Sequence, residues 1–201
     1  MSSTSMKAPK SIGSIELSDD KYTIVEGNIN FIYRIDDSRG NTVLRFNMEE
    51  GEGDDYHIKD ANDELVGIMG RHYNSPEIPE GHDGDYVIYS VIEDEPLASI
   101  SLSWTTGAKV TNYNNSEEIV TVDVNNLRRL YAVFGKWPIN ALLTRKWKFN
   151  SPSKGQIGKL EENNSFNPFG KPTNELSFDK SVNLTDFEKL CVMGVGTIAV
   201  Y

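Results

Sequence analysis

The side chains best suited to metal chemistry are concentrated in one short stretch of the chain. Imidazole and carboxylate groups, which divalent metals prefer as ligands, stand at His72, Glu77, Glu80, His82, Asp83 and Asp85. No two of these residues have the i, i+4 spacing of a helical zinc site, and the segment also contains Pro76, Pro79 and two glycines. This composition is typical of a surface loop. We therefore expect a solvated acidic loop and no metal site.

Catalytic motifs have little support in the sequence. Cys191 is the single cysteine, and it lies in an apolar run with no histidine nearby, an environment that raises the pKa of a thiol. The chain contains no G-x-S-x-G, no phosphate-binding glycine loop and no H-E-x-x-H. A carboxylate pair for glycoside hydrolysis stays open, because the separation of two carboxyl groups is a three-dimensional quantity. Trp104, Trp137 and Trp147 could stack on sugars, although core packing is the more usual role of tryptophan.

Charge is distributed unevenly along the chain, whose net charge is −10. Residues 49–95 contain 15 acidic and two basic residues, whereas residues 125–150 contain six basic residues and no acidic one. An acidic chain is a poor general partner for nucleic acid. A local basic patch, with Arg128, Arg129, Lys146 and Lys148 as its candidate binding residues, suits an anionic phospholipid headgroup. The alternative is that the two charged regions face each other or simply keep the protein soluble.

Most of the chain has the period-two alternation of half-buried β-strands. Residues 98–104 place apolar side chains at even positions and serine at every odd position, and residues 120–124 alternate valine with polar residues. Trp147 and Phe149 alternate with Lys146 and Lys148 in the same way. Turn-forming residues separate eleven or twelve such segments. The spacing predicts an all-β barrel or sandwich.

The C-terminal segment departs from this pattern. Thr185 and Glu188 form a capping box, and the run from Leu190 to Tyr201 that follows contains no charged residue. A helix from Asp186 to Val200 would be ~22 Å long and too short to span a bilayer. It would be apolar on every side, and such a helix must be buried on every side. A central strand is the competing interpretation, but we expect a helix enclosed by the strands.

Three hairpin-like segments share a layout of strand, turn and strand: residues 35–46, 58–69 and 149–160. The third aligns with the second without gaps, which matches Gly158 with Gly67. Any meander of hairpins can produce such similarity, yet together with the apolar C-terminal helix these segments resemble the tubby C-terminal-like superfamily. That superfamily includes phospholipid scramblases and plant LURP-one-related proteins. The resemblance implies a closed antiparallel barrel of about twelve strands around a buried hydrophobic C-terminal helix.

The resemblance carries over few functional residues. Scramblases have a Pro-rich extension and a palmitoylated cysteine cluster, which this sequence does not show, so we expect neither acylation nor lipid scrambling. The calcium segment of that family would fall near Asp179, Asp186 and Glu188, but the last two suit a helix N-terminus instead. Tubby proteins bind phosphoinositides through basic residues on the barrel surface. This sequence offers only its unaligned basic patch for such a role.

The remaining bounds follow from length and composition. With 201 residues, 38% hydrophobic and 10% aromatic, the chain fits one globular domain, which we place at residues 20–201 after a disordered tail at residues 1–19. No apolar stretch is long enough for a transmembrane helix, and no secretory signal is apparent. The single cysteine suits a reducing compartment. We expect a monomer without cofactors, cytoplasmic and able to associate peripherally with membranes.

Three functions remain open at this point. The first is a non-enzymatic binding module for a phosphoinositide, another phospholipid or a protein partner. The second is a lipocalin-like carrier of a small apolar ligand, which requires an empty lumen. The third is a carbohydrate-active or lectin-like protein that uses carboxylates and tryptophans in an open cleft.

Overall fold

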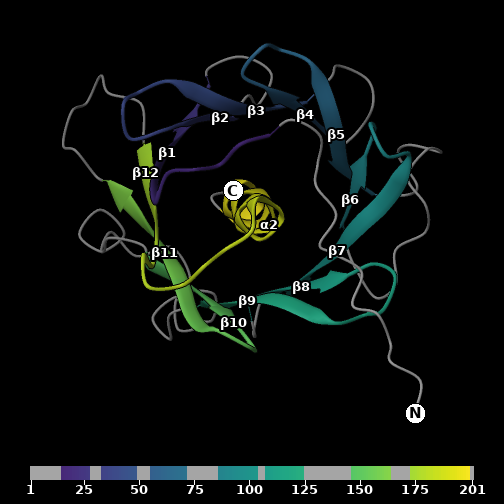
Figure 1. The fold of residues 1–201 in the computed structure, drawn as a ribbon, viewed down its shortest axis with the longest axis vertical. Helices are drawn as coiled ribbons and strands as arrows, with labels where there is room; N and C mark the ends of the chain where they lie inside the picture. The colour runs from purple at the N-terminus through teal and green to yellow at the C-terminus, as the bar shows by residue number, and fades with distance from the viewer. Residues whose placement is uncertain are drawn as a thin grey trace, which may run out of the picture.

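The computed structural model describes residues 15–27, 33–48, 55–71, 86–103, 107–124, 146–163 and 173–199. These residues form twelve strands and one helix (Figure 1). The elements are β1 (Lys21–Glu26), β2 (Tyr33–Asp36), β3 (Thr42–Met48), β4 (Tyr56–Asp60), β5 (Leu65–Gly70), β6 (Tyr86–Ser90), β7 (Glu95–Ser103), β8 (Gly107–Asn112), β9 (Glu118–Val124), β10 (Lys146–Ser151), β11 (Gly155–Asn163), β12 (Thr173–Phe178) and α2 (Asp186–Ala199).

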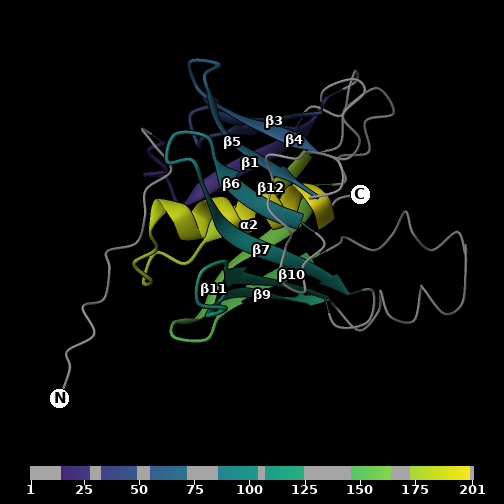
Figure 2. The same ribbon diagram turned by 90° about the vertical axis from the view of Figure 1, so that its right-hand side faces the viewer.

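The strands form one closed antiparallel barrel in which each pairs with its neighbours in sequence. β1 also pairs with β12, through partners such as Tyr22 and Leu176, and this pairing closes the sheet. α2 runs through the middle of the barrel (Figures 1 and 2). The predicted fold, a closed barrel of about twelve strands around a C-terminal helix, is confirmed.

The alternation seen in the sequence corresponds to the inner and outer faces of the barrel. Ala98 and Ile100 in β7 are fully buried, as is Val120 in β9. Trp147 and Phe149 in β10 also belong to the core, so the lysines between and before them lie on the outer face. Inward side chains from every strand therefore surround α2.

The helix begins at the predicted capping box. The backbone N–H of Thr185 donates to Glu188 Oε2 at 2.8 Å, and the backbone N–H of Glu188 donates to Thr185 Oγ1 at 3.2 Å. From Leu190 to Val195 every described apolar side chain is at most 1% exposed. The apolar run is thus enclosed on all sides as far as Val195, as its composition requires.

The hairpin turns that the structure describes lie at the same end of the barrel, where α2 begins (Figure 2). They join β2 to β3, β4 to β5, β6 to β7, β8 to β9 and β10 to β11, and each pair has a register shift. Each turn contains one residue with a positive φ: Gly40, Asp63, Asp94, Ser116 and Gly155. A left-handed residue followed by a bulge is a common way to close a short hairpin. We call this the hairpin end.

The domain begins earlier than we expected from the sequence. Residues 15–19 belong to the described structure, and Leu17 is 1% exposed in the core. The N–H of Leu17 donates to Asp186 Oδ1 at 3.2 Å, so this segment is fixed to the first turn of α2. The predicted tail at residues 1–19 thus overlaps the described structure at residues 15–19, and residues 1–14 lie outside the described residues. The polar composition of this segment gave no sign in the sequence that Leu17 is buried.

At two glycines an added Cβ would lie close to a neighbouring atom, but the kind of atom differs between them. A Cβ on Gly158 in β11 would lie 2.8 Å from the backbone carbonyl oxygen of Ser177, which cannot move without shifting β12. A Cβ on Gly194 in α2 would lie 3.1 Å from Met69 Sδ, which is the flexible part of a side chain. A Cβ at Gly194 therefore requires only a small shift of a flexible side chain, whereas a Cβ at Gly158 requires movement of the backbone.

These contacts predict an order of stability for three substitutions. Gly158→Ala should lower the free energy of unfolding by about 1–3 kcal/mol, because the added atom forces backbone movement. Gly194→Ala should change it by less than about 1 kcal/mol, since the gain in helix propensity offsets the tighter contact. Gly194→Leu should cost about 1–3 kcal/mol or more by overpacking the barrel interior. Urea unfolding followed by circular dichroism measures all three, and an unaffected Gly194→Leu protein would show that the helix is loosely enclosed.

Candidate functional site

The barrel interior is occupied by protein. Val192, Met193 and Val195 of α2 are fully buried among the inward side chains of the strands. A lipocalin-like carrier needs that space for its ligand. The filled interior therefore leaves the outer face and the ends of the barrel as the surfaces on which a ligand site could lie.

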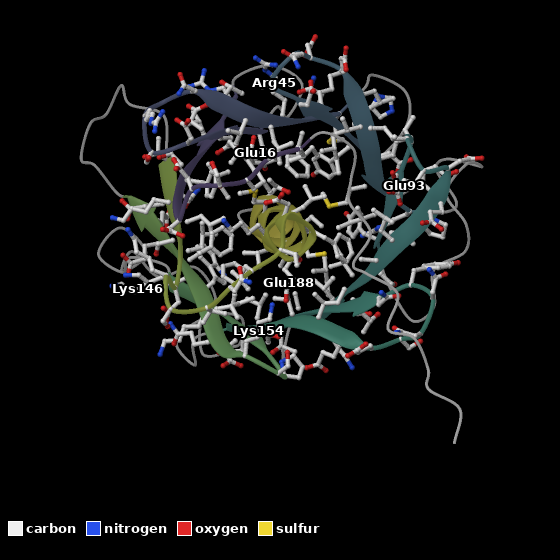
Figure 3. The ribbon with its side chains drawn as sticks, in the orientation of Figure 1. Glu16, Arg45, Glu93, Lys146, Lys154 and Glu188 are labelled. Carbon is white, nitrogen blue, oxygen red and sulfur yellow. The ribbon has the colours of Figure 1, made fainter. Side chains whose placement is uncertain are left out.

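Two of the four candidate binding residues lie side by side on the outer face of β10. Lys146 and Lys148 are both exposed, and the core residue Trp147 between them points inward. Figure 3 shows Lys146 on the outside of the barrel. The other two candidates, Arg128 and Arg129, lie outside the described residues, as does the predicted acidic loop between His72 and Asp85.

Strand register brings two further lysines to the same surface. Lys148 on β10 is directly opposite Lys159 on β11, and the row continues through Ser177 on β12 to Lys21 on β1. We call Lys21, Lys146, Lys148 and Lys159 the lysine surface. Reasoning from the sequence missed Lys21 and Lys159, because neither lies near β10 in the chain. The outward parity of Lys159 in β11 is visible in the sequence, but its pairing with β10 requires the hairpin register.

Acidic residues offset part of this positive charge. Glu161 accepts from Lys146 at 3.0 Å and from Lys159 at 3.2 Å, and Lys21 lies 3.5 Å from Glu175. The hydrogen bond from Lys146, followed by that from Lys159, holds the pKa of Glu161 below its usual value. Within the described part of the chain, Lys148 has no ion-pair partner within 4 Å. Its ammonium group is therefore available to an external anion.

A second basic row crosses the outer face on other strands. Arg34 on β2 is directly opposite Arg45 on β3, which in turn is opposite Lys59 on β4. Each arginine has a carboxylate nearby: Arg34 Nε lies 3.0 Å from Asp36, and Arg45 Nη1 lies 3.5 Å from Asp63. Lys59 has no ion-pair partner within 4 Å among the described residues, so two of the three cations of this row are paired. We do not assign this row a ligand.

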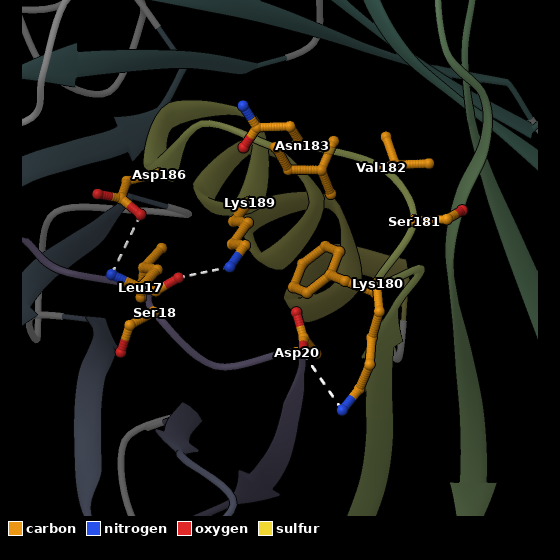
Figure 4. Close-up of a pocket in the computed structure, with 11 residues that line it drawn as sticks. Leu17, Ser18, Asp20, Lys180, Ser181, Val182, Asn183, Asp186 and Lys189 are labelled. Carbon is orange, nitrogen blue, oxygen red and sulfur yellow. Dashed lines mark hydrogen bonds and ion pairs between the residues drawn. The ribbon is translucent and has the colours of Figure 1, made fainter.

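The hairpin end contains a shallow polar pocket of about 430 Å³ around the start of α2 (Figure 4). Its lining includes Ser18 and Asp20 from the N-terminal segment, Lys180 from the connection to the helix, and Asp186 and Lys189 from the helix itself. Asp20 and Lys180 form an ion pair across it at 3.6 Å.

The charged groups of this pocket hold the N-terminal segment in place. Lys189 is only 7% exposed, and its ammonium group donates to the carbonyl oxygens of Leu17 at 2.5 Å and Asp19 at 2.9 Å. The same nitrogen lies 5.6 Å from the centroid of the Phe178 ring, which is a favourable position for a cation. Nearby, Lys154 donates to both carboxylate oxygens of Glu188, at 2.6 and 2.7 Å. We therefore infer that the residues lining this pocket close this end of the barrel.

The side chains considered for metal or covalent chemistry have other roles where the structure describes them. Asp179 accepts hydrogen bonds from Ser181, Asp186 accepts from Leu17, and Glu188 is held by Lys154 and Thr185. Among the described residues, no group of three histidine, cysteine or acidic side chains is placed to hold a metal ion. Burial raises the pKa of Cys191 well above its ordinary value, so its thiol is protonated.

The tryptophans do not form an exposed platform for sugars in the described structure. Trp147 is 3% exposed and packs in the core, and Trp104 and Trp137 lie outside the described residues. The alternation of Trp147 with Lys146 and Lys148 in the sequence already favoured the inward face for this side chain. No described helix combines the length and the apolar composition that crossing a membrane requires.

Comparison with known proteins finds similarity only at the level of the fold. No family model matches the chain, and no curated protein matches it. Among solved structures, the barrel is similar to an X-ray structure of a protein from Arabidopsis thaliana, with a TM-score of 0.51 and 12% sequence identity. The similarity covers 90% of this chain and 91% of the plant protein. At this identity the likeness shows a shared barrel and nothing about activity.

The contacts of Lys189 predict that it stabilises the closed end of the barrel. Lys189→Met should lower the free energy of unfolding by about 1–3 kcal/mol, because two carbonyl oxygens lose their donor in a largely buried position. Lys180→Met is the matched control: its side chain is 78% exposed, and it should change stability by no more than about 0.5 kcal/mol. Urea midpoints measure both variants. Equal stabilities of the two would contradict this role for Lys189.

Proposed function

We propose that this protein is a non-enzymatic binding module whose lysine surface contacts anionic phospholipid headgroups. The observation that carries the proposal is the direct cross-strand pairing of Lys148 with Lys159 on the exposed outer face. Like charges directly opposite each other destabilise a sheet. Glu161 lies 3.2 Å from Lys159, so the charge of this pair that stays uncompensated is that of Lys148, and a phosphate group bound beside it would compensate it.

The charge balance of the surface indicates weak and salt-sensitive binding. Its four lysines are accompanied by Glu161, Glu175 and Asp123, the last of which is opposite Lys148 on β9. Each lysine near an anionic membrane contributes about 1 kcal/mol, and this attraction falls off within a Debye length. The net charge of −10 opposes attachment elsewhere on the molecule. The protein would therefore need a headgroup of high charge, and a phosphoinositide meets that requirement.

The architecture is consistent with a distant relationship to the tubby C-terminal-like superfamily, and we include that relationship in the proposal. A twelve-stranded barrel closed around an apolar C-terminal helix is what the resemblance implies for the fold. In that superfamily the basic outer face of the barrel is the part used for phosphoinositides. The lysine surface occupies a comparable kind of location here, on the outside of the barrel.

The other two functions have less support. A carrier of small apolar ligands would need the space that α2 occupies. A lectin-like protein would need exposed aromatic rings, and Trp147 points into the core.

Vesicle sedimentation tests the proposal. Phosphatidylcholine vesicles containing phosphatidylinositol bisphosphate should retain the protein at low salt and release it as salt is raised. The double variant Lys148→Glu/Lys159→Glu should bind at least about tenfold more weakly, because two attractive charges become repulsive. The Lys146→Glu/Lys148→Glu variant should behave in the same direction.

The control for this experiment is Lys109→Glu/Lys180→Glu, which changes the net charge by the same amount at exposed positions outside the lysine surface. It should retain most of the binding. Failure of the wild-type protein to sediment with these vesicles at low salt would overturn the proposal. An equal loss of binding in Lys148→Glu/Lys159→Glu and in the control Lys109→Glu/Lys180→Glu would also overturn it, because binding would then follow net charge alone.

A further inference from the structure

The large apolar side chains that are exposed in the described structure gather at one place. They are Leu65 at the start of β5, 36% exposed, and Val91 and Ile92 in the turn between β6 and β7, 38% and 55% exposed. The two turns are neighbours at the hairpin end, and the N–H of Val91 donates to the carbonyl of Val66 at 3.2 Å. Three exposed apolar residues from two turns thus belong to one surface, whereas isolated ones would need no explanation.

An apolar stripe on the outer face continues from these turns. Ile68 on β5 is directly opposite Tyr89 on β6, and Tyr89 is opposite Pro96 on β7. All three are partly exposed. On β10 and β11, by contrast, the corresponding outer-face positions hold the lysines Lys148 and Lys159. We call Leu65, Ile68, Tyr89, Val91, Ile92 and Pro96 the tip surface.

The turns that carry the tip surface are acidic, and two basic side chains lie beside them: Lys59 on β4 is directly opposite Leu65, and Arg45 on β3 lies 3.5 Å from Asp63. The turns at residues 60–65 and 90–96 contain acidic residues at positions 60, 63, 64, 93, 94 and 95 and no lysine or arginine. Glu93 is exposed beside Ile92, and Asp94 accepts a hydrogen bond from Tyr89. Figure 3 shows Glu93 and Lys146 on opposite sides of the barrel, so this acidic rim is separate from the lysine surface.

We propose that the tip surface docks a protein segment in which apolar side chains alternate with lysine or arginine. Apolar contact with Ile92, Val91 and Leu65 would supply most of the attraction. The acidic rim would select a basic partner and increase its rate of encounter. The same rim repels anionic membranes, so the chemistry favours a basic protein segment over a lipid surface. This inference does not depend on the phospholipid proposal.

A synthetic peptide of alternating lysine and leucine, labelled with a fluorophore, is the probe for this surface. Fluorescence anisotropy with the full-length protein should show saturable binding that weakens as salt rises. A peptide with serine in place of leucine should bind more weakly by about fivefold or more, because the apolar contact is lost. A peptide with glutamate in place of lysine should not bind.

Variants of the protein distinguish the tip surface from general charge attraction. Ile92→Ser and Glu93→Lys should each weaken binding of the lysine–leucine peptide by about fivefold or more. Glu117→Lys is the matched control: it makes the same change in net charge at an exposed residue in the turn between β8 and β9, and it should bind like the wild type. Circular dichroism confirms that each variant is folded.

Four results would overturn the inference. The first is that the wild-type protein does not bind the lysine–leucine peptide, and the second is that Ile92→Ser binds it as tightly as the wild type. The third is that Glu93→Lys and Glu117→Lys weaken peptide binding equally, and the fourth is that Ile92→Ser abolishes sedimentation with vesicles while no peptide binds. The last would assign the surface to a membrane. If sedimentation equilibrium shows self-association that Ile92→Ser abolishes, while the peptide does not bind, the occupant is a second copy of this chain.

Discussion

A helix without a polar face is the constraint on which this structure depends. From Leu190 to Val195, α2 presents apolar side chains that are buried in every direction, so no single sheet or layer of helices could cover it. A closed barrel is the arrangement that surrounds one helix completely and also leaves no sheet edge unpaired. The twelve strands, their inward apolar rows and the missing lumen all follow from enclosing this element.

Enclosing the helix also determines where function can reside. Every inward position is committed to packing against α2, so chemistry is left to the outer face and the two ends. On the outer face, neighbouring residues are determined by register and not by distance along the chain. The lysine surface and the tip surface both arise in this way, and they lie on opposite sides of the barrel (Figure 3). One sheet thus presents a basic face and an apolar face with an acidic rim.

Much of the fold could be predicted from the sequence because it depends on local patterns. The alternation in β7, β9 and β10, the capping box at Thr185 and the uniform apolarity after Leu190 are each contained within a short segment. The match between Gly67 and Gly158 has a structural counterpart as well. In both, an added Cβ would lie 2.8 Å from a backbone carbonyl of the next strand. Similar hairpins therefore place a glycine where the strands approach most closely.

The functional surfaces could be predicted only in part, because they depend on contacts between distant segments. Lys146 and Lys148 were recognisable as an exposed pair, but Lys21 joins them only through the pairing of β1 with β12. The anchoring of Leu17 by Lys189 and Asp186 likewise spans nearly the whole chain. Ile68, Tyr89 and Pro96 form a row only once three strands are in register. No local pattern contains this information.

The position of α2 at the end of the sequence affects how the protein can be assembled during synthesis. The interior element emerges from the ribosome only after the strands that surround it. Until then the apolar faces of the strands have nothing to pack against, and β1 cannot pair stably with β12 around an empty centre. The nascent chain therefore exposes apolar sheet surface for most of its translation, which makes it a natural client for chaperones. Closure of the barrel around its core therefore has to wait until α2 has been synthesised.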